Sequence, residues 1–129
     1  MSELRISLRQ DRTAFEPGEE LNGAVLWKLD EPPHAVELRL FWFTRGKGTE
    51  DTGVVKTVQF DQPLPQETRS FGFRLPAAPY SFSGKLISLV WALELVVEPS
   101  REVCRLQIIV APGGQEVRLD SIPTSDLDW

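Results

Sequence analysis

The chain has 129 residues, a length typical of one domain, and an apolar share of 41%, which is sufficient for a core. Its net charge of -5 and its pI of about 4.9 argue against binding to nucleic acid or to an anionic membrane surface. Both of those partners call for clustered Lys and Arg.

Alternation of apolar and polar residues at every second position runs through most of the chain and predicts β-strands. No window of useful length has the apolar spacing of a helix, and most of the ten prolines lie between the apolar runs. About seven short strands are expected, with a weaker one near the end. In chain order the strands are marked by Leu4, Ile6, Leu8; Leu21, Gly23, Val25, Trp27, Leu29; Val36, Leu38, Leu40, Trp42; Val54, Val58, Phe60; Phe71, Phe73, Leu75; Ile87, Leu89, Trp91, Leu93, Leu95, Val97; Cys104, Leu106, Ile108, Val110; and, more weakly, Val117, Leu119.

These strands predict a single all-β domain, a two-sheet antiparallel β-sandwich of the immunoglobulin-like or arrestin-like type, over residues 1–112. Its two sheets would press their apolar faces together, and the aromatic residues would supply much of the filling. After Pro112 the apolar density falls and the acid content rises. We therefore expect residues 113–129 to form a partly ordered, acidic C-terminal extension.

A sharp corner is expected where the chain reads "FEPGEELNGAV", residues 15–25. Pro17 fixes φ at the second position of a turn, and Gly18 can take the positive φ that the third position of a type II turn requires. Such a corner lets the chain leave one sheet and enter the other.

Two stretches of the sequence resemble the N-terminal domain of the arrestin-like family. The first is the corner, where a short strand precedes a Pro-Gly-Glu turn and a valine-rich strand; the second, residues 71–97, has an aromatic strand ending at Leu-Pro, a Pro/Ser/Gly loop and a long strand with an aromatic. The matching residues are Phe15, Pro17, Gly18, Glu19, Leu21, Gly23 and Val25, and then Phe71, Phe73, Leu75, Pro76, Ser81, Gly84, Ile87 and Trp91.

The chain departs from that family in three respects. It has room for one sandwich where arrestins usually have two, and no segment matches the helix of the arrestin N-domain. Its first strand, "LRISLR", carries Arg5 and Arg9 where receptor-binding members use adjacent lysines to sense phosphate. The resemblance therefore implies a single-lobe, minimal version that binds other proteins without catalysis, and no phosphate-sensing role.

The residue types that carry chemistry are sparse. The single His34 follows two prolines in a predicted turn, and the single Cys104 lies in a strand, so neither a metal site nor an internal disulfide is expected. The segment "GKGTEDTG" joins two strands and lacks the helix that a phosphate-binding loop needs. Acid pairs at 19–20, 50–51 and 126/128 are interpreted as solvated charges rather than as a hydrolase or calcium site. We expect no enzyme activity, no cofactor and no metal.

The N-terminal residues mix charge with apolar side chains, unlike a signal peptide. The longest apolar run, residues 86–97, contains Glu94 and is too short to span a bilayer. A cytoplasmic protein without membrane insertion is the expectation.

Two features exceed what a plain sandwich needs and predict a site for a partner. If Leu38, Leu40 and Trp42 face the core, then Phe41 and Phe43 project from the opposite face, which calls for a cover. The chain also ends in acids that flank Leu127 and Trp129, a composition suited to a basic, apolar groove. The cover would be this tail, a second copy of the chain or another protein. The remaining outer-face apolar candidates are Leu86, Val90 and Val96.

Two alternatives stay open. An unpaired edge strand can accept a strand from a partner, but the sequence does not say which strands are edges. A small-molecule or carbohydrate-binding sandwich is a different class of function, with Arg45, Lys47 and Tyr80 at its rim.

Overall fold

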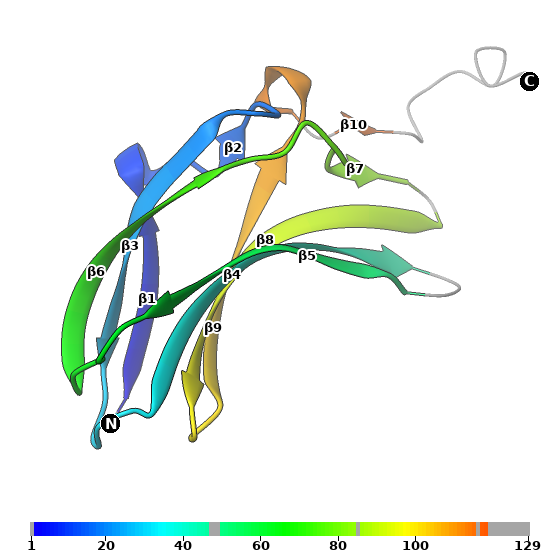
Figure 1. Cartoon of the computed structure of the whole chain (residues 1–129). Helices are drawn as coiled ribbons and strands as arrows, with labels where there is room; N and C mark the ends of the chain where they lie inside the picture. Colours follow the sequence, from blue (N-terminus) through cyan, green and yellow to red (C-terminus); the bar gives the residue numbers. More distant parts are fainter. Residues whose placement is uncertain (1, 47–49, 85, 116, 119–129) are drawn as a thin grey trace, which may run out of the picture.

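Two β-sheets dominate the chain, and they face each other as the alternation predicts (Figure 1). The computed structural model describes residues 2–46, 50–84, 86–115 and 117–118. Strands of this part of the chain are β1 (Glu3–Leu8), β2 (Ala14–Phe15), β3 (Glu20–Lys28), β4 (Ala35–Gly46), β5 (Thr52–Phe60), β6 (Gln66–Arg74), β7 (Phe82–Ser83), β8 (Ile87–Glu98), β9 (Glu102–Val110) and β10 (Val117–Arg118).

The smaller sheet has the order β1-β3-β6 and is antiparallel throughout. In the larger sheet, β5, β4 and β8 pair in that order, and both β9 and β7 pair with β8. The short strands β2 and β10 join it by parallel pairing, to β9 and β7 respectively. The prediction of a two-sheet β-sandwich is confirmed. The weak last strand is present at Val117, whereas its second marker, Leu119, lies outside the described residues.

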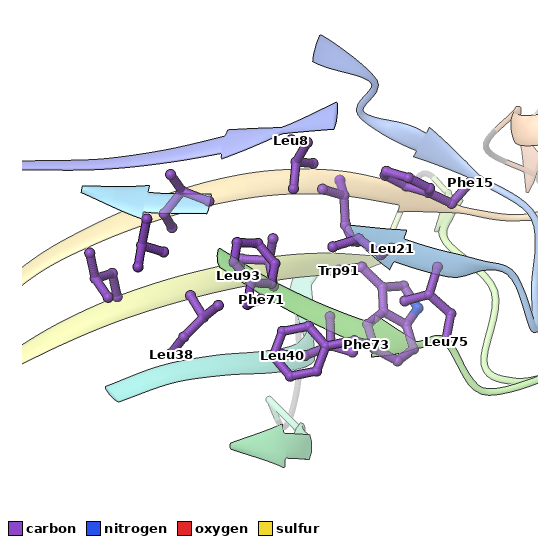
Figure 2. Close-up of a cluster of buried hydrophobic side chains, with 14 of the residues drawn as sticks. Leu8, Phe15, Leu21, Leu38, Leu40, Phe71, Phe73, Leu75, Trp91 and Leu93 are labelled. Atoms are coloured by element: carbon purple, nitrogen blue, oxygen red, sulfur yellow. The ribbon is translucent and has the colours of Figure 1, made fainter. Parts of the chain in front are cut away.

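The core fills the space between the sheets with the predicted apolar residues (Figure 2). Trp27 and Trp91 are fully buried, and each indole N–H donates to a backbone carbonyl, that of Leu64 at 2.7 Å and that of Pro79 at 2.9 Å. Both indole N–H groups therefore keep a hydrogen-bond partner when the side chains are buried, which removes the main cost of burying a tryptophan. Around them lie Leu8, Phe15, Leu21, Leu38, Leu40, Phe71, Phe73, Leu75 and Leu93.

The predicted corner carries the chain from the larger sheet to the smaller one. Gly18 has φ +80°, and the Glu19 N–H donates to the Glu16 carbonyl at 3.1 Å, as a type II turn requires. The strand before the turn, β2, belongs to the larger sheet, and the strand after it, β3, belongs to the smaller one. Arg12 holds the turn through an ion pair to Glu19, with 2.5 Å between Nη1 and Oε2.

Strand β5 departs from simple alternation. Leu40 pairs with Lys56 and Phe41 pairs with Val54, so Val55 is an extra residue that forms a β-bulge. Uninterrupted alternation would place Val54 on the same face as Val58 and Phe60. Because of the bulge, Val55 packs against the core and Val54 lies opposite Phe41 on the outer face, 59% exposed.

Candidate functional site

Phe41 and Phe43 project from the outer face of the larger sheet, as predicted. Their rings stack with centroids 5.9 Å apart and an interplanar angle of 26°. Phe41 is nevertheless only 6% exposed, while Phe43 is half-buried. Some side chain of the described chain must therefore cover Phe41.

The cover is Arg105 from β9, which reaches the rings across β8, the strand that lies between β4 and β9. Its guanidinium carbon lies 5.0 Å from the centroid of Phe41 and 5.3 Å from that of Phe43, within the range of cation–π attraction. Antiparallel pairing of β8 with β9 places Glu94 directly opposite Arg105. The two side chains form an ion pair, 2.9 Å between Nη2 and Oε2, which holds the guanidinium over the rings.

A second arginine extends this arrangement along β4. Arg39 pairs with Glu37 at 2.6 Å and lies 3.9 Å from Glu94, so one carboxylate faces two guanidinium groups. Further along the strand, Arg45 is exposed and its guanidinium carbon lies 5.6 Å from the centroid of Phe43. We call this surface the aromatic–arginine patch; it comprises Arg39, Phe41, Phe43, Arg45, Val54, Glu94 and Arg105.

The patch encloses a shallow hollow of about 310 Å³. Phe41 and Phe43 line it, with exposed Val54 at one side and Arg105, half of whose side chain is accessible, at the other. The lining is completed by Arg39, Thr44, Glu50, Thr52 and Glu94. Such a surface offers stacking, apolar contact and guanidinium donors at once, which suits a polypeptide segment that combines acidic and apolar side chains.

The other residues singled out by sequence do not converge. His34 is exposed in the turn between β3 and β4, and half-buried Cys104 packs against the core from β9. Within the described ranges, no group of three or more His, Cys, Asp or Glu side chains has the arrangement of a metal site. Likewise, no described helix has the length and apolar character needed to cross a membrane.

Among the described residues, Glu19 and Glu67 have lowered pKa values, and both are structural. A side-chain hydrogen bond from Arg12 is the main cause that lowers the pKa of Glu19, and the Glu16 N–H adds to it. A hydrogen bond from Arg69 lowers the pKa of Glu67 in the same way, with help from the Leu64 N–H. Both carboxylates are thereby held ionised as hydrogen-bond acceptors, which suits anchoring rather than proton transfer.

The remaining partner-binding candidates, Leu127 and Trp129, lie outside the described residues, as does Lys47 of the carbohydrate-site alternative. Tyr80, also from that alternative, is exposed in the loop before β7. The role of Leu127 and Trp129 therefore stays a prediction.

The structure identifies the edge strands that the sequence left open. The larger sheet ends at β5 on one side and at the two-residue β10 on the other, and the smaller sheet ends at β1 and β6. A bulge interrupts β5, and β6 carries the ion pair of Glu67 and Arg69 on the face that its buried Phe71 and Phe73 also occupy. Bulges and inward-facing charges both discourage the addition of a further strand. The outer face of the larger sheet is thus a better candidate for binding than its edges.

Sequence reasoning missed Arg105, the residue that covers the two phenylalanines. A local signal for part of its role was present, since Glu94 and Arg105 lie at equal distances from the turn at Pro99-Ser100 and a hairpin pairs them. Its position over Phe41 and Phe43 depends on β4 lying beside β8, a pairing between strands far apart in the chain. Alternation within a strand does not reveal that pairing.

Comparison with known proteins finds no protein-family model and no curated protein that matches the sequence. Among solved structures, Spo0M, a sporulation control protein from Bacillus subtilis, superposes with a TM-score of 0.59 at 19% identity, over 85% of this chain and 49% of Spo0M. A β-glucosidase from Listeria innocua, in complex with gluconolactone, gives 0.49 at 14% identity over 91% of this chain and 16% of the enzyme. The chain spans about half the length of Spo0M, whose arrestin-like fold it shares.

Proposed function

We propose that the chain is a non-enzymatic protein-interaction module that binds a segment of a partner protein on the aromatic–arginine patch. The observation that carries the proposal is the pair of stacked phenylalanines beneath Arg105, beside a hollow that is open to solvent. An arrestin-like scaffold is compatible with such a role, because its rigid sheets can present a fixed surface to a partner.

The chemistry of the patch indicates the kind of segment that would bind. Arg45 has no carboxylate of the described residues within ion-pair distance, and more than half of the Arg105 side chain is accessible. An acidic residue of the partner can therefore pair with either guanidinium at low desolvation cost. An apolar residue of the partner would fill the hollow against Phe43 and Val54, where it replaces water on apolar surface.

Selection from a peptide library by the immobilised full chain tests this proposal. Peptides enriched in Asp or Glu next to an apolar or aromatic residue are expected. The variants Arg45→Glu and Val54→Asp, at two exposed positions of the patch, should lose them. Arg9→Glu is the matched control, because Arg9 is exposed in the turn after β1, on the smaller sheet, and carries the same charge change.

Equal binding of the selected peptides by the patch variants and by the unmodified chain would contradict the proposal. A sugar or metabolite that raises the melting temperature in a thermal-shift panel would favour the small-molecule alternative. In that case, Tyr80 and Arg45 would be the first residues to replace.

A further inference from the structure

We infer that residues 119–129 of the chain itself bind the aromatic–arginine patch and compete there with the external partner. The inference rests on the proposed function, which identifies the patch as a binding surface, and it names a segment of the chain itself that binds there. Three observations carry it: the place where the described chain ends, the path from there to the patch, and the composition of the segment.

The described chain ends beside the patch, within the same sheet. Arg118 of β10 pairs with Ser83 of β7, Ser83 pairs with Ser88 of β8, and Ser88 pairs with Arg45 of β4. These four residues form one row across the sheet, and Figure 1 shows β10 and β7 toward the same end of the molecule as the C-terminal end of β4. Three strand spacings of about 4.8 Å separate Arg118 from Arg45, roughly 14 Å in all.

The row carries small side chains on its outer face. Ser83 and Ser88 are small, and they lie on the outer face because Phe82 and Leu89, their neighbours in sequence, turn toward the core. A fully extended segment of this length reaches roughly 36 Å, more than twice the separation. Residues 119–129 can therefore cross β7 and β8 and place their last residues over Phe43 and the hollow.

The composition of the segment complements the patch. It reads "LDSIPTSDLDW", with three aspartates and no lysine or arginine. Asp126 and Asp128 flank Leu127, so acidic and apolar side chains are adjacent in the segment, as guanidinium groups and aromatic rings are on the patch. Trp129 adds the largest apolar surface of the segment, and a buried aromatic of that kind covers about 150–250 Å². Stacking on Phe43 beside Arg45 is the arrangement that uses both properties.

Covalent attachment makes weak contacts sufficient. A tethered segment with a short connection has an effective concentration in the millimolar range, so contacts that would be weak between separate molecules still hold it in place. An external partner must then displace the segment, which lowers the partner's apparent affinity by the fraction of patches already occupied.

The test is ¹⁹F NMR of the full chain labelled with 5-fluorotryptophan, in which Trp129→Phe identifies the Trp129 resonance among the four tryptophans. The resonance should be displaced from that of a labelled synthetic peptide of residues 119–129. It should move toward the peptide value in Arg45→Glu and at high salt, because salt screens the attraction between Asp and Arg. Arg9→Glu should leave it unchanged.

A charge exchange makes the test specific. Replacing both Asp126 and Asp128 by Lys should also shift the resonance toward the peptide value, and combining these changes with Arg45→Glu should restore part of the displacement. The inference would be overturned if the Trp129 resonance coincided with that of the peptide, if Arg45→Glu left its position unchanged, or if its position depended on protein concentration. The last outcome would indicate binding between copies instead.

The two proposals fail separately. If the Trp129 resonance coincides with that of the peptide but the selected library peptides require Arg45 for binding, then the intramolecular binding of residues 119–129 is wrong and the partner site is still supported. If the Trp129 resonance is displaced but neither the unmodified chain nor its Trp129→Ala variant selects any peptide, then the proposed binding of an external partner is wrong.

Discussion

At the scale of single residues, the patch depends on the choice of arginine at position 105. Its planar, delocalised guanidinium can lie flat over two rings while its N–H groups still donate to Glu94. A lysine ammonium is a compact, strongly hydrated charge that cannot do both. The side chain therefore covers Phe41 and still keeps an accessible positive charge.

Arg105→Lys is accordingly expected to destabilise the fold by about 0.5–1 kcal/mol, the usual worth of an accessible cation–π contact. It should also increase the binding of a hydrophobic dye, because Phe41 and Phe43 lose their cover. Urea unfolding and dye fluorescence measure the two effects. Arg5→Lys, on the exposed surface of β1, is the control, and equal behaviour of the two variants would show that Arg105 does not cover the rings.

Ser81 is the buried polar residue of the described core, at 1% exposure. Its hydroxyl accepts a hydrogen bond from the Val110 N–H at 2.9 Å, and its own N–H donates to the Val110 carbonyl at 2.7 Å. Ser81→Ala leaves the Val110 N–H buried without a partner, which is expected to cost about 1–3 kcal/mol of stability. Thermal or urea unfolding measures it, and Ser88→Ala, on the outer face, should change little.

At the scale of elements, local patterns determined the strands better than their partners. Alternation located β1, β3, β4, β6, β8 and β9, and the Pro17-Gly18 signal located the corner, because both depend on neighbours in sequence. The bulge at Val55 was not predicted, since it depends on how β5 fits Leu40 and Phe41 of β4. The patch was half predicted for the same reason: Phe41 and Phe43 follow from alternation within β4, but Arg105 comes from β9.

The corner predicts a specific dependence on pH. The pKa of Glu19 is lowered in the folded chain, chiefly by Arg12, so its contribution to stability is present above the unfolded-state pKa of about 4.3. That contribution is lost as the pH falls from there through the lower, folded-state pKa. Glu19→Gln should therefore destabilise the chain at pH 7 and make its stability less sensitive to acid below about pH 4.3.

Urea unfolding at pH 7 and at pH 3 measures this effect. Glu20→Gln provides the control, because Glu20 is exposed at the start of β3 and no ion pair is seen for it among the described residues. If Glu19→Gln kept the full acid sensitivity of the unmodified chain, the ion pair with Arg12 would not anchor the corner.

At the scale of the whole molecule, the sandwich is closed along one side and open along the other. Strand β1 lies against β9, and β2 crosses to pair with β9 just before the corner, whereas β5 and β6 end the two sheets without pairing to each other. Strand β8 is the centre of the larger sheet, with β4 along its whole length and β9 and β7 on its other side.

Hydrogen exchange should follow this architecture. The amides of β8 and of the paired face of β4 are expected to exchange slowest, through global unfolding, while those of β5 and β6 exchange through local opening. Exchange measured by mass spectrometry or NMR at neutral pH tests this order. Faster exchange in β8 than in β6 would show that the larger sheet does not form the most stable unit.

The bulge in β5 has a consequence for how this strand can vary. The register that it creates sets Gly53 opposite Trp42, where an added Cβ would overlap the indole. Deletion of Val55 would remove the bulge and leave Gly53 opposite Trp42, whereas Gly53→Ala would press the added Cβ against the indole. Gly53→Ala should therefore destabilise the chain, as urea unfolding would show. The exposed side chains along β5 are thus free to vary, but position 53 is restricted to glycine by one tryptophan on the neighbouring strand.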